Sequence, residues 1–145
     1  MRIAVLSDTH DRLPDHVVAA IREADEIWHL GDVTTPAIIE RLRALRRPLR
    51  VVRGNCDECP DWPHALEFEL AGLRFVLMHI PPQHPIAGID VLLHGHTHVP
   101  RNEVLAGMRV LNPGCISRAN KGAPASYAWL ELHDGTPLIW ETVPV

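Results

Sequence analysis

The sequence contains little cysteine. Its three cysteines, Cys56, Cys59 and Cys115, are an odd number in a chain of 145 residues, so a disulfide framework is not indicated and a reducing environment is expected. Cys56 and Cys59 form a Cys-x-x-Cys pair, but no second pair accompanies it. We therefore interpret the pair as coincidence, with Cys59 structural, rather than as a redox motif or half of a zinc site.

Long hydrophobic runs are also absent. No apolar run approaches the roughly 20 residues that a membrane-spanning helix needs. The apolar start of the chain, Met1–Leu6, is followed too soon by Asp8 to form the core of a signal peptide. We therefore expect a cytoplasmic protein that does not associate with membranes.

Positive charge and aromatic residues are scarce as well. The formal net charge is -4 and only 5% of the residues are aromatic, which gives no general attraction to nucleic acid or to an anionic membrane. Six arginines do cluster in one stretch: Arg41, Arg43, Arg46, Arg47, Arg50 and Arg53. No aromatic residues are interleaved with them to stack bases, so we interpret the cluster as a solvated face, and nucleic acid is not an expected partner.

The first third of the chain alternates short apolar runs with helical patterns. The expected elements are strands at 2–7, 26–30 and 49–52 and helices at 14–24 and about 36–46. This alternation is typical of a parallel sheet with crossover helices. In such sheets, ligands bind beyond the carboxyl ends of the strands.

The later chain has a different pattern, in which paired strands are separated by short turns. The expected pairs are 65–70 with 73–78, 102–105 with 108–111, and 126–132 with 137–143 around a turn at 133–136, and a further strand covers 90–93. We therefore expect an α/β fold with a largely antiparallel second half. No linker or repeat divides the sequence, so a single domain over residues 1–145 is expected.

Two histidines, His96 and His98, follow the strand at 90–93 and the glycine Gly95. In an extended chain, residues two apart point to the same face, and neutral imidazole is the commonest protein ligand for a transition metal. Taken alone, the pair is better interpreted as solvated histidines in a loop at the strand end. Its interpretation depends on what the other strand ends provide.

Polar residues of the same kind follow the other expected strands. Together with the two histidines they form this set: Asp8, His10, Asp32, Asn55, Asp57, His79, His96 and His98. Carboxylates, imidazoles and an amide suit Mn²⁺, Fe²⁺ or Zn²⁺ better than calcium, and their number suits two adjacent metals that share a carboxylate. Each residue also has an ordinary alternative, such as a helix cap for Asp8 or Asp32, a turn for Asn55 or a buried core position for His79.

These blocks occur in the order typical of one known family. The sequence resembles, over essentially its whole length, the calcineurin-like metallophosphoesterases and in particular their small YfcE-type bacterial and archaeal phosphodiesterases. The residues that carry the resemblance are Asp8-x-His10, Gly31-Asp32, Gly54-Asn55-x-Asp57, His79 and Gly95-His96-x-His98. The resemblance implies a β-sandwich of two mixed sheets flanked by helices, an αββα arrangement.

The resemblance also implies a site with two divalent metal ions, with Mn²⁺ as the first expectation and Fe²⁺, Ni²⁺ or Zn²⁺ as alternatives. One metal would be bound by Asp8, His10 and His98, the other by Asn55, His79 and His96, with Asp32 bridging both. Asp57 would orient a neighbouring group of the site. The family's catalytic positions correspond to Asp32, Asn55, Cys56, Asp57 and His96.

The implied activity is hydrolysis of a small phosphate ester, with a phosphodiester expected, by in-line attack of a metal-bridging hydroxide. Small members of the family often form dimers or tetramers, so a homo-oligomer is expected. The alternative is a non-catalytic metal-binding scaffold on the same fold, as in a retromer coat subunit. Both interpretations require metal, and only the first requires turnover.

The sequence departs from the family pattern at two places. Cys56 stands where a histidine commonly protonates the leaving group, and a thiol with a pKa of about 8.5 is a poor general acid, so Cys56 remains a candidate. Only residues 80–89 separate His79 from the next strand, and their three prolines make a helix there improbable. We expect a shortened, extended connection after His79, which leaves either an open cleft or a surface covered by a second subunit. Asn112-Pro113-Gly114 resembles the family's Asn-Pro-Gly-Ser stretch, for which a tight turn is expected.

Overall fold

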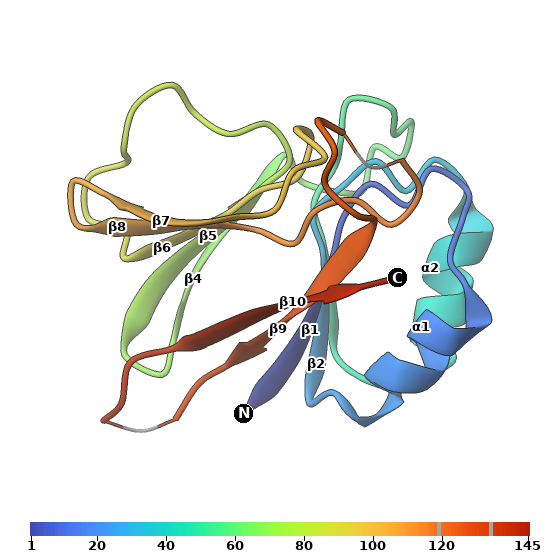
Figure 1. The fold of residues 1–145 in the computed structure, drawn as a ribbon, viewed down its shortest axis with the longest axis horizontal. Coiled ribbons are helices and arrows are strands. Elements are labelled where there is room, and N and C mark those ends of the chain that lie inside the picture. The colour runs from blue at the N-terminus through green and yellow to red at the C-terminus, as the bar shows by residue number, and fades with distance from the viewer. Residues whose placement is uncertain (119, 134) are drawn as a thin grey trace.

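The computed structural model describes residues 1–118, 120–133 and 135–145. Two five-stranded sheets pack face to face, and the helices lie on the outer side of one of them (Figure 1). The expected sandwich of two mixed sheets is confirmed. The turn expected at 133–136 includes Asp134, which lies outside the described residues.

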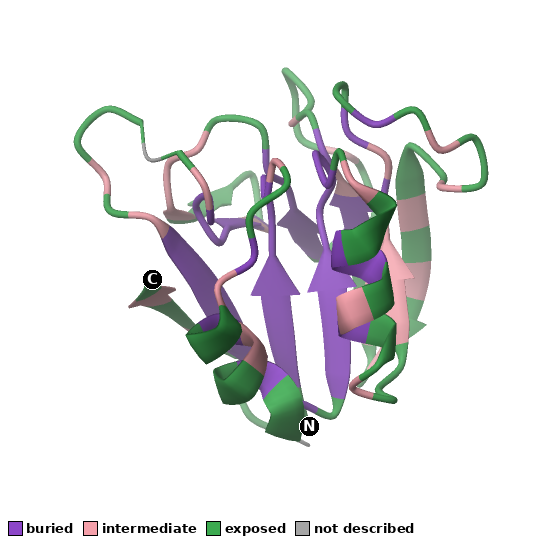
Figure 2. Cartoon of the chain, turned by 90° about the vertical axis from the view of Figure 1, so that its right-hand side faces the viewer, coloured by how far each residue is buried: buried purple, intermediate pink, exposed green. Residues whose placement is uncertain are grey.

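The first sheet has the strand order β10-β9-β1-β2-β3. Its strands are β1 (Arg2–Leu6), β2 (Glu26–His29), β3 (Leu49–Val51), β9 (Ser126–Glu131) and β10 (Ile139–Pro144). As expected, β1, β2 and β3 are parallel, while β9 pairs antiparallel with both β1 and β10. The carboxyl ends of β1, β2 and β3 therefore lie at one edge of the sheet, where Figure 2 shows the arrowheads pointing toward a group of loops.

The second sheet has the strand order β4-β5-β6-β8-β7. Its strands are β4 (Ala65–Leu70), β5 (Leu73–Met78), β6 (Val91–Leu93), β7 (Arg101–Leu105) and β8 (Met108–Asn112). The predicted hairpins β4–β5 and β7–β8 are confirmed. β6 pairs parallel with both β5 and β8, so the second half is largely antiparallel, as expected, with parallel pairs at the centre of this sheet. Turn signals identify only neighbouring strands that are joined by tight turns, and β6 has no such turn.

The helices provide the crossovers between the parallel strands of the first sheet. They are α1 (Asp15–Ala20), the 3₁₀ turn η1 (Ile21–Glu23) and α2 (Pro36–Arg43). The helix expected at 14–24 is thus an α-helix that tightens into a 3₁₀ turn. The second helix ends earlier than expected, since Arg46 has a positive φ of 56° and cannot continue a right-handed helix.

Alternating side chains divide the apolar core into layers. On β1, Ala4 and Leu6 pack under the helices, whereas Ile3 and Val5 face the second sheet. This is the period of two expected for a strand that is buried on both faces. The layer of apolar side chains between the two sheets is thereby continuous. It fixes how the carboxyl ends of the strands in one sheet face those in the other.

The connection over residues 79–90 contains no helix. It covers the outer face of the second sheet, where Ile86 and Ile89 pack with the buried Val76, Leu92 and other side chains of that face. The shortened connection is therefore confirmed. Within the described ranges, helices lie outside the first sheet only (Figure 1), so the second helical layer of an αββα arrangement is not formed.

Among the described residues, no helix combines the length and the apolar character that crossing a bilayer requires.

Candidate metal centre

The loops that follow β1, β2, β3, β5 and β6 meet at one edge of the sandwich. Their backbone is strained: of the eleven described residues other than glycine with positive φ, seven lie here, namely Asp8, His10, Asp11, Asp32, Thr34, His96 and His98. Such conformations cost free energy and persist where the surrounding structure holds them, commonly at functional sites. Two glycines in these loops allow close approach, because a Cβ on Gly54 would collide with the carboxylate of Asp32 and one on Gly95 with Ser7.

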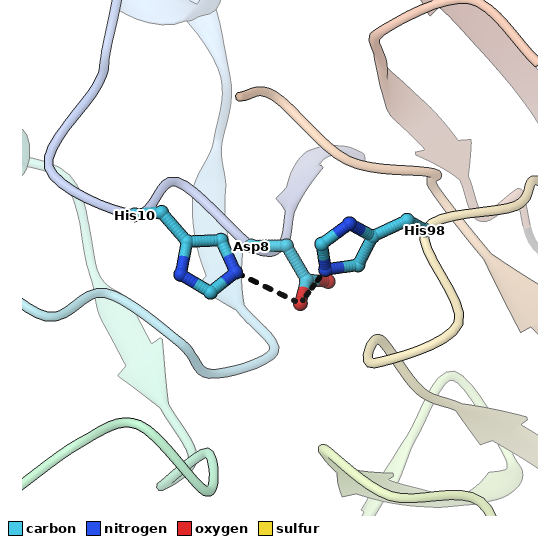
Figure 3. A group of neighbouring side chains, drawn as sticks. All are labelled: Asp8, His10 and His98. Carbon is cyan, nitrogen blue, oxygen red and sulfur yellow. Dashed lines mark ion pairs between the residues drawn. The ribbon is translucent and has the colours of Figure 1, made fainter. Parts of the chain in front are cut away.

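The carboxylate of Asp8 lies fully buried at the centre of this edge. Its Oδ2 accepts hydrogen bonds from the Ser7 hydroxyl (2.5 Å) and the His96 backbone N–H (3.1 Å). Its Oδ1 lies 3.1 Å from Nε2 of His98 and 3.9 Å from Nε2 of His10. Figure 3 shows both imidazoles directing one ring nitrogen at this carboxylate. Hydrogen bonds thus hold Oδ2 of Asp8 in place, whereas Oδ1 faces the imidazoles of His98 and His10.

Asp32 divides its two oxygens in the same way. Its Oδ1 accepts a hydrogen bond of 2.9 Å from the backbone N–H of Cys56. Its Oδ2 lies 3.3 Å from Nε2 of His79 and 3.6 Å from Nε2 of His10. His10 therefore stands between the two aspartates.

The orientation of two imidazoles follows from their second nitrogen. Nδ1 of His79 lies 2.8 Å from the carbonyl oxygen of Leu30, and Nδ1 of His98 lies 2.7 Å from that of Arg118. A carbonyl oxygen only accepts, so each Nδ1 carries the hydrogen. In the neutral imidazoles, Nε2 then presents a lone pair toward a carboxylate oxygen. Two electron-rich atoms that face each other in this way need a cation or a proton between them.

Three buried polar atoms at this edge have no hydrogen-bond partner: Asp8 Oδ1, His10 Nε2 and His79 Nε2. Elsewhere in the described chain, only the indole nitrogens of two tryptophans share this condition. Buried polar atoms are normally paired, because an unpaired one costs free energy. Carboxylate oxygen and imidazole nitrogen are also the donor atoms that first-row divalent metals prefer. The residues present therefore fit a metal site.

The potential ligand atoms form three overlapping groups, within each of which the atoms lie no more than 4.8 Å apart. The groups are Asp8, His10 and His98; His10, Asp32 and Cys56; and Asp8, Asp32 and His79. Five of the seven ligands expected from the sequence are thus brought together. Asp8, His10 and Asp32 are each shared between two of these groups.

The other two expected ligands, Asn55 and His96, are exposed and lie beside these groups. Oδ1 of Asn55 and Nδ1 of His96 are 3.0 Å apart, so the two side chains hydrogen-bond to each other. The His96 ring also stands edge-on to that of His79, with 5.3 Å between centroids. His96 is therefore adjacent to the metal groups through His79, and Asn55 is held beside it.

Asp57 has a supporting position. Its buried carboxylate accepts four backbone hydrogen bonds of 2.8–2.9 Å, from the N–H groups of Asp32, Val33, Thr34 and Gly54. Asp57 thus joins the loop after β2 to the loop after β3. It orients Asp32 through the backbone, a contact that the position of Asp57 in the motif did not reveal.

Burial and neighbouring groups shift the pKa values of the titratable residues in this site. Burial raises the pKa of Asp8, even though the Ser7 hydrogen bond lowers it. Burial also opposes ionisation of Asp32, but the nearby His79 imidazole and the hydrogen bond from Cys56 hold the pKa of Asp32 well below its usual range. Burial lowers the pKa of His79, but the adjacent carboxylates of Asp32 and Asp8 outweigh that effect and raise it.

Cys56 keeps its proton under the same influences. Desolvation, its hydrogen bond to Asp32 and the nearby carboxylates all raise the pKa of the thiol. Its side chain also accepts a hydrogen bond of 3.3 Å from the Asn55 amide. In the protein alone, Cys56 is therefore a neutral thiol and not a thiolate.

Asn112 is a supporting residue whose role was not evident from the sequence. Its amide nitrogen donates to the Gly95 carbonyl (3.0 Å) and the Thr97 hydroxyl (3.1 Å), and its oxygen accepts from the Gly114 N–H (2.8 Å). Asn112 therefore holds the loop that carries His96 and His98, in addition to forming the expected turn. Its place in the Asn-Pro-Gly stretch was the only sequence signal for it.

Two comparisons identify the family. A model of the calcineurin-like phosphoesterase superfamily domain matches residues 1–135. The chain therefore belongs to the calcineurin-like phosphoesterase superfamily, and the metal-dependent phosphoesterase class expected from the sequence is confirmed.

Individual relatives agree with this assignment. A probable metallophosphoesterase of Methanothermobacter thermautotrophicus is 37% identical over 132 residues, which cover 79% of this chain and 76% of the relative. Phosphodiesterase YfcE of Escherichia coli K12 is 30% identical over 164 residues, covering 90% of this chain and 88% of YfcE. A solved structure of YfcE covers the same shares, with 29% identity and a TM-score of 0.79. Zinc-bound Vps29 of Entamoeba histolytica shares the fold, with 22% identity, a TM-score of 0.80 and coverage of 99% of this chain and 98% of Vps29.

Proposed function

We propose that this protein is a phosphodiesterase that uses two divalent metal ions to hydrolyse a small phosphate diester. The observation that carries the proposal is the set of unpaired buried atoms on Asp8, His10 and His79. Keeping such atoms unpaired destabilises a fold unless a ligand binds them. The relatives named phosphodiesterase or metallophosphoesterase support the reaction class.

The ligands divide into two sets that share Asp32. Asp8, His10 and His98 would hold one ion, and His79 with Asn55 and His96 would hold the other once the hydrogen bond between Asn55 and His96 opens. Bound metals would supply positive charge for the phosphoryl oxygens and would lower the pKa of a bound water, the nucleophile for in-line hydrolysis. Mn²⁺ is the proposed ion, because carboxylate and imidazole donors together suit it.

The chain's own residues position the substrate. His96 is exposed at the mouth of the site; its Nδ1 donates to Oδ1 of Asn55, so Nε2 of the neutral ring carries the lone pair that a metal ion would take. Cys56 is exposed and protonated, so its thiol can donate a hydrogen bond to the leaving oxygen. Asp57 holds the loops that carry Asp32 and Cys56, which fixes the spacing between the metals and the donor. Preorganised donors of this kind stabilise the charge that develops in the transition state.

Hydrolysis of bis-p-nitrophenyl phosphate in the presence of Mn²⁺ tests the proposal. Asp32→Ala and His98→Ala are expected to lower kcat/KM by more than about a hundredfold, because each removes a metal ligand. His16→Ala is the matched control, since His16 is an exposed histidine on α1 away from the metal groups, and it should leave kcat/KM unchanged.

The same assay separates an enzyme from a scaffold. A metal-binding scaffold would also hold metal at the converging ligands, so turnover is the observation that distinguishes the two. Stoichiometric metal binding without hydrolysis of any phosphodiester, in Mn²⁺, Fe²⁺, Ni²⁺ and Zn²⁺ alike, would favour the scaffold and overturn the proposal.

A further inference from the structure

We propose that a cavity beside the metal centre binds a planar aromatic group on the retained ester of the diester, and that Ile80 and Met78 determine this preference. The inference rests on the proposed function and names its substrate class. The cavity has a volume of about 330 Å³ and is lined by residues that include Arg53, Asn55, His64, Met78, His79 and Ile80. This volume lies within the range of small-molecule sites, roughly 300–1,000 Å³.

The cavity shares two lining residues with the site. Asn55 and His79 line it, and Nε2 of His79 lies 3.3 Å from Oδ2 of Asp32. A diester carries two ester groups on one phosphorus. When its phosphoryl oxygens lie at the metal groups, one ester group has room in the cavity that starts at Asn55 and His79.

A second cavity accounts for the other ester group. It has a volume of about 560 Å³ and is lined by residues that include Cys56, Glu58 and Trp62. Cys56, the protonated thiol at the site, is the candidate donor to the leaving oxygen, and it lines this second cavity and not the first. The leaving group therefore belongs on the Cys56 side, and the retained group belongs in the cavity with Met78 and Ile80.

The lining of the first cavity favours an aromatic ring. Its surface is mainly apolar, and Ile80 is one of the few large apolar residues that are exposed, with 53% of its surface accessible. The thioether of Met78 makes favourable contacts with aromatic rings. Arg53 uses Nε to bind the Asp57 carbonyl and forms no ion pair within the described chain, so its guanidinium plane is available to stack on a ring.

The short connection over residues 79–90 provides part of the apolar lining of the first cavity. Ile80 comes directly after His79, and the chain then runs on without a helix, so Ile80 remains exposed beside the site. Met78 stands at the end of β5 in register with Ala65 of β4, and these two residues form the adjoining part of the wall.

Kinetics with two diesters test the preference. Bis-p-nitrophenyl phosphate and methyl p-nitrophenyl phosphate share a leaving group and differ in the retained group. Ile80→Ala is expected to lower kcat/KM about fivefold to tenfold for the first and less than twofold for the second, by loss of an apolar contact in the pocket. Ile80→Phe should retain the preference. Ile139→Ala is the matched control, because Ile139 is 52% exposed on β10, outside the lining of this cavity.

A binding measurement supplies a readout that is independent of turnover. Diphenylphosphinate carries two rings on phosphorus and is not hydrolysed, and dimethylphosphinate lacks the rings. With methyl-labelled methionine, the NMR signal of Met78 is expected to shift upfield with diphenylphosphinate and not with dimethylphosphinate. Met108, buried on the outer face of the second sheet, is the internal reference.

The outcomes separate the two proposals. Equal losses for both diesters in Ile80→Ala, or an unmoved Met78 signal in protein saturated with diphenylphosphinate, would overturn the aromatic subsite and leave the phosphodiesterase intact. A wild-type protein that hydrolyses neither diester would overturn the proposed function. A Met78 shift in that inactive protein would still show that the cavity takes the ring.

Discussion

Asp8 and His98 meet across the two sheets, with 3.1 Å between Oδ1 and Nε2. Asp8 follows β1 of the first sheet, and His98 lies beyond β6 of the second. Because Nδ1–H of His98 donates a hydrogen bond to the Arg118 carbonyl oxygen, Nε2 of the neutral ring directs a lone pair at the carboxylate. A cation between the two atoms converts this repulsion into two bonds, so metal binding should hold the sheets together at this edge.

Metal should therefore stabilise the fold. At a free metal concentration about 100 times Kd, binding to the native state adds about 2.7 kcal/mol, which corresponds to a rise in Tm of roughly 5–10 °C for a chain of this size. Thermal unfolding with EDTA and with Mn²⁺ measures the difference. The double variant Asp8→Asn, His98→Ala should lose the response, and a full response in that variant would contradict the assigned ligands.

Asp57 should contribute to the free energy of unfolding as well as to the geometry of the site. Replacing it with alanine leaves four backbone N–H groups without their acceptor, and we expect a loss of about 3–5 kcal/mol in the free energy of unfolding. Chemical denaturation measures the loss. Asp61→Ala changes an exposed aspartate in the same segment and should cost less than about 0.5 kcal/mol. Similar values for the two variants would show that the Asp57 hydrogen bonds contribute little.

Asn112 should act on the metal through the loop it holds. Asn112→Ala removes the donor to Gly95 and Thr97, so the loop carrying His96 and His98 loosens, and metal affinity should fall about 10- to 100-fold. Isothermal titration with Mn²⁺ measures the affinity. The control is Asn102→Ala, which changes an exposed asparagine on β7 that contacts Arg109. An unchanged Mn²⁺ affinity in Asn112→Ala would show that Asn112 forms the turn but does not support the metal ligands.

Buried His29 should make the protein less stable in acid. Burial lowers the pKa of His29 to about 4, from 6.5. Its Nδ1 accepts a hydrogen bond from the Gly31 N–H (3.2 Å), which a proton on Nδ1 would displace. The unfolded chain binds this proton below pH 6.5 and the native protein does not, so stability falls by up to about 1.4 kcal/mol per pH unit between pH 6.5 and 4.

Unfolding of the metal-free protein across this pH range measures the effect. His29→Asn removes the titrating group, and its stability should therefore fall less steeply with acid than that of the wild type. Equal slopes for the two proteins would mean that His29 titrates normally in the native state.

Much of the site was predictable because of where its residues stand in the sequence. Asp8, Asp32 and His79 each follow a run of buried strand residues, and the carboxyl ends of such strands converge. The paired strands β4 and β5 were predicted with their observed bounds, since a turn at 71–72 separates two clear patterns.

Other features depend on tertiary contacts that no local pattern encodes. The four bonds to Asp57 require two loops to fold against each other, and the role of Asn112 requires β8 to lie beside β6. Motif spacing also could not show that Asn55 and His96 pair with each other, whereas the other five ligands converge.

Anomalous diffraction from crystals grown with Mn²⁺ tests the central claim most directly. Two peaks roughly 3.5–4 Å apart are predicted, one contacting Asp8, His10 and His98 and the other contacting His79, with Asp32 between them. A single peak would contradict the two-metal centre. Peaks elsewhere on the protein, with Asp8 and His79 uncoordinated, would contradict the assignment of the site itself.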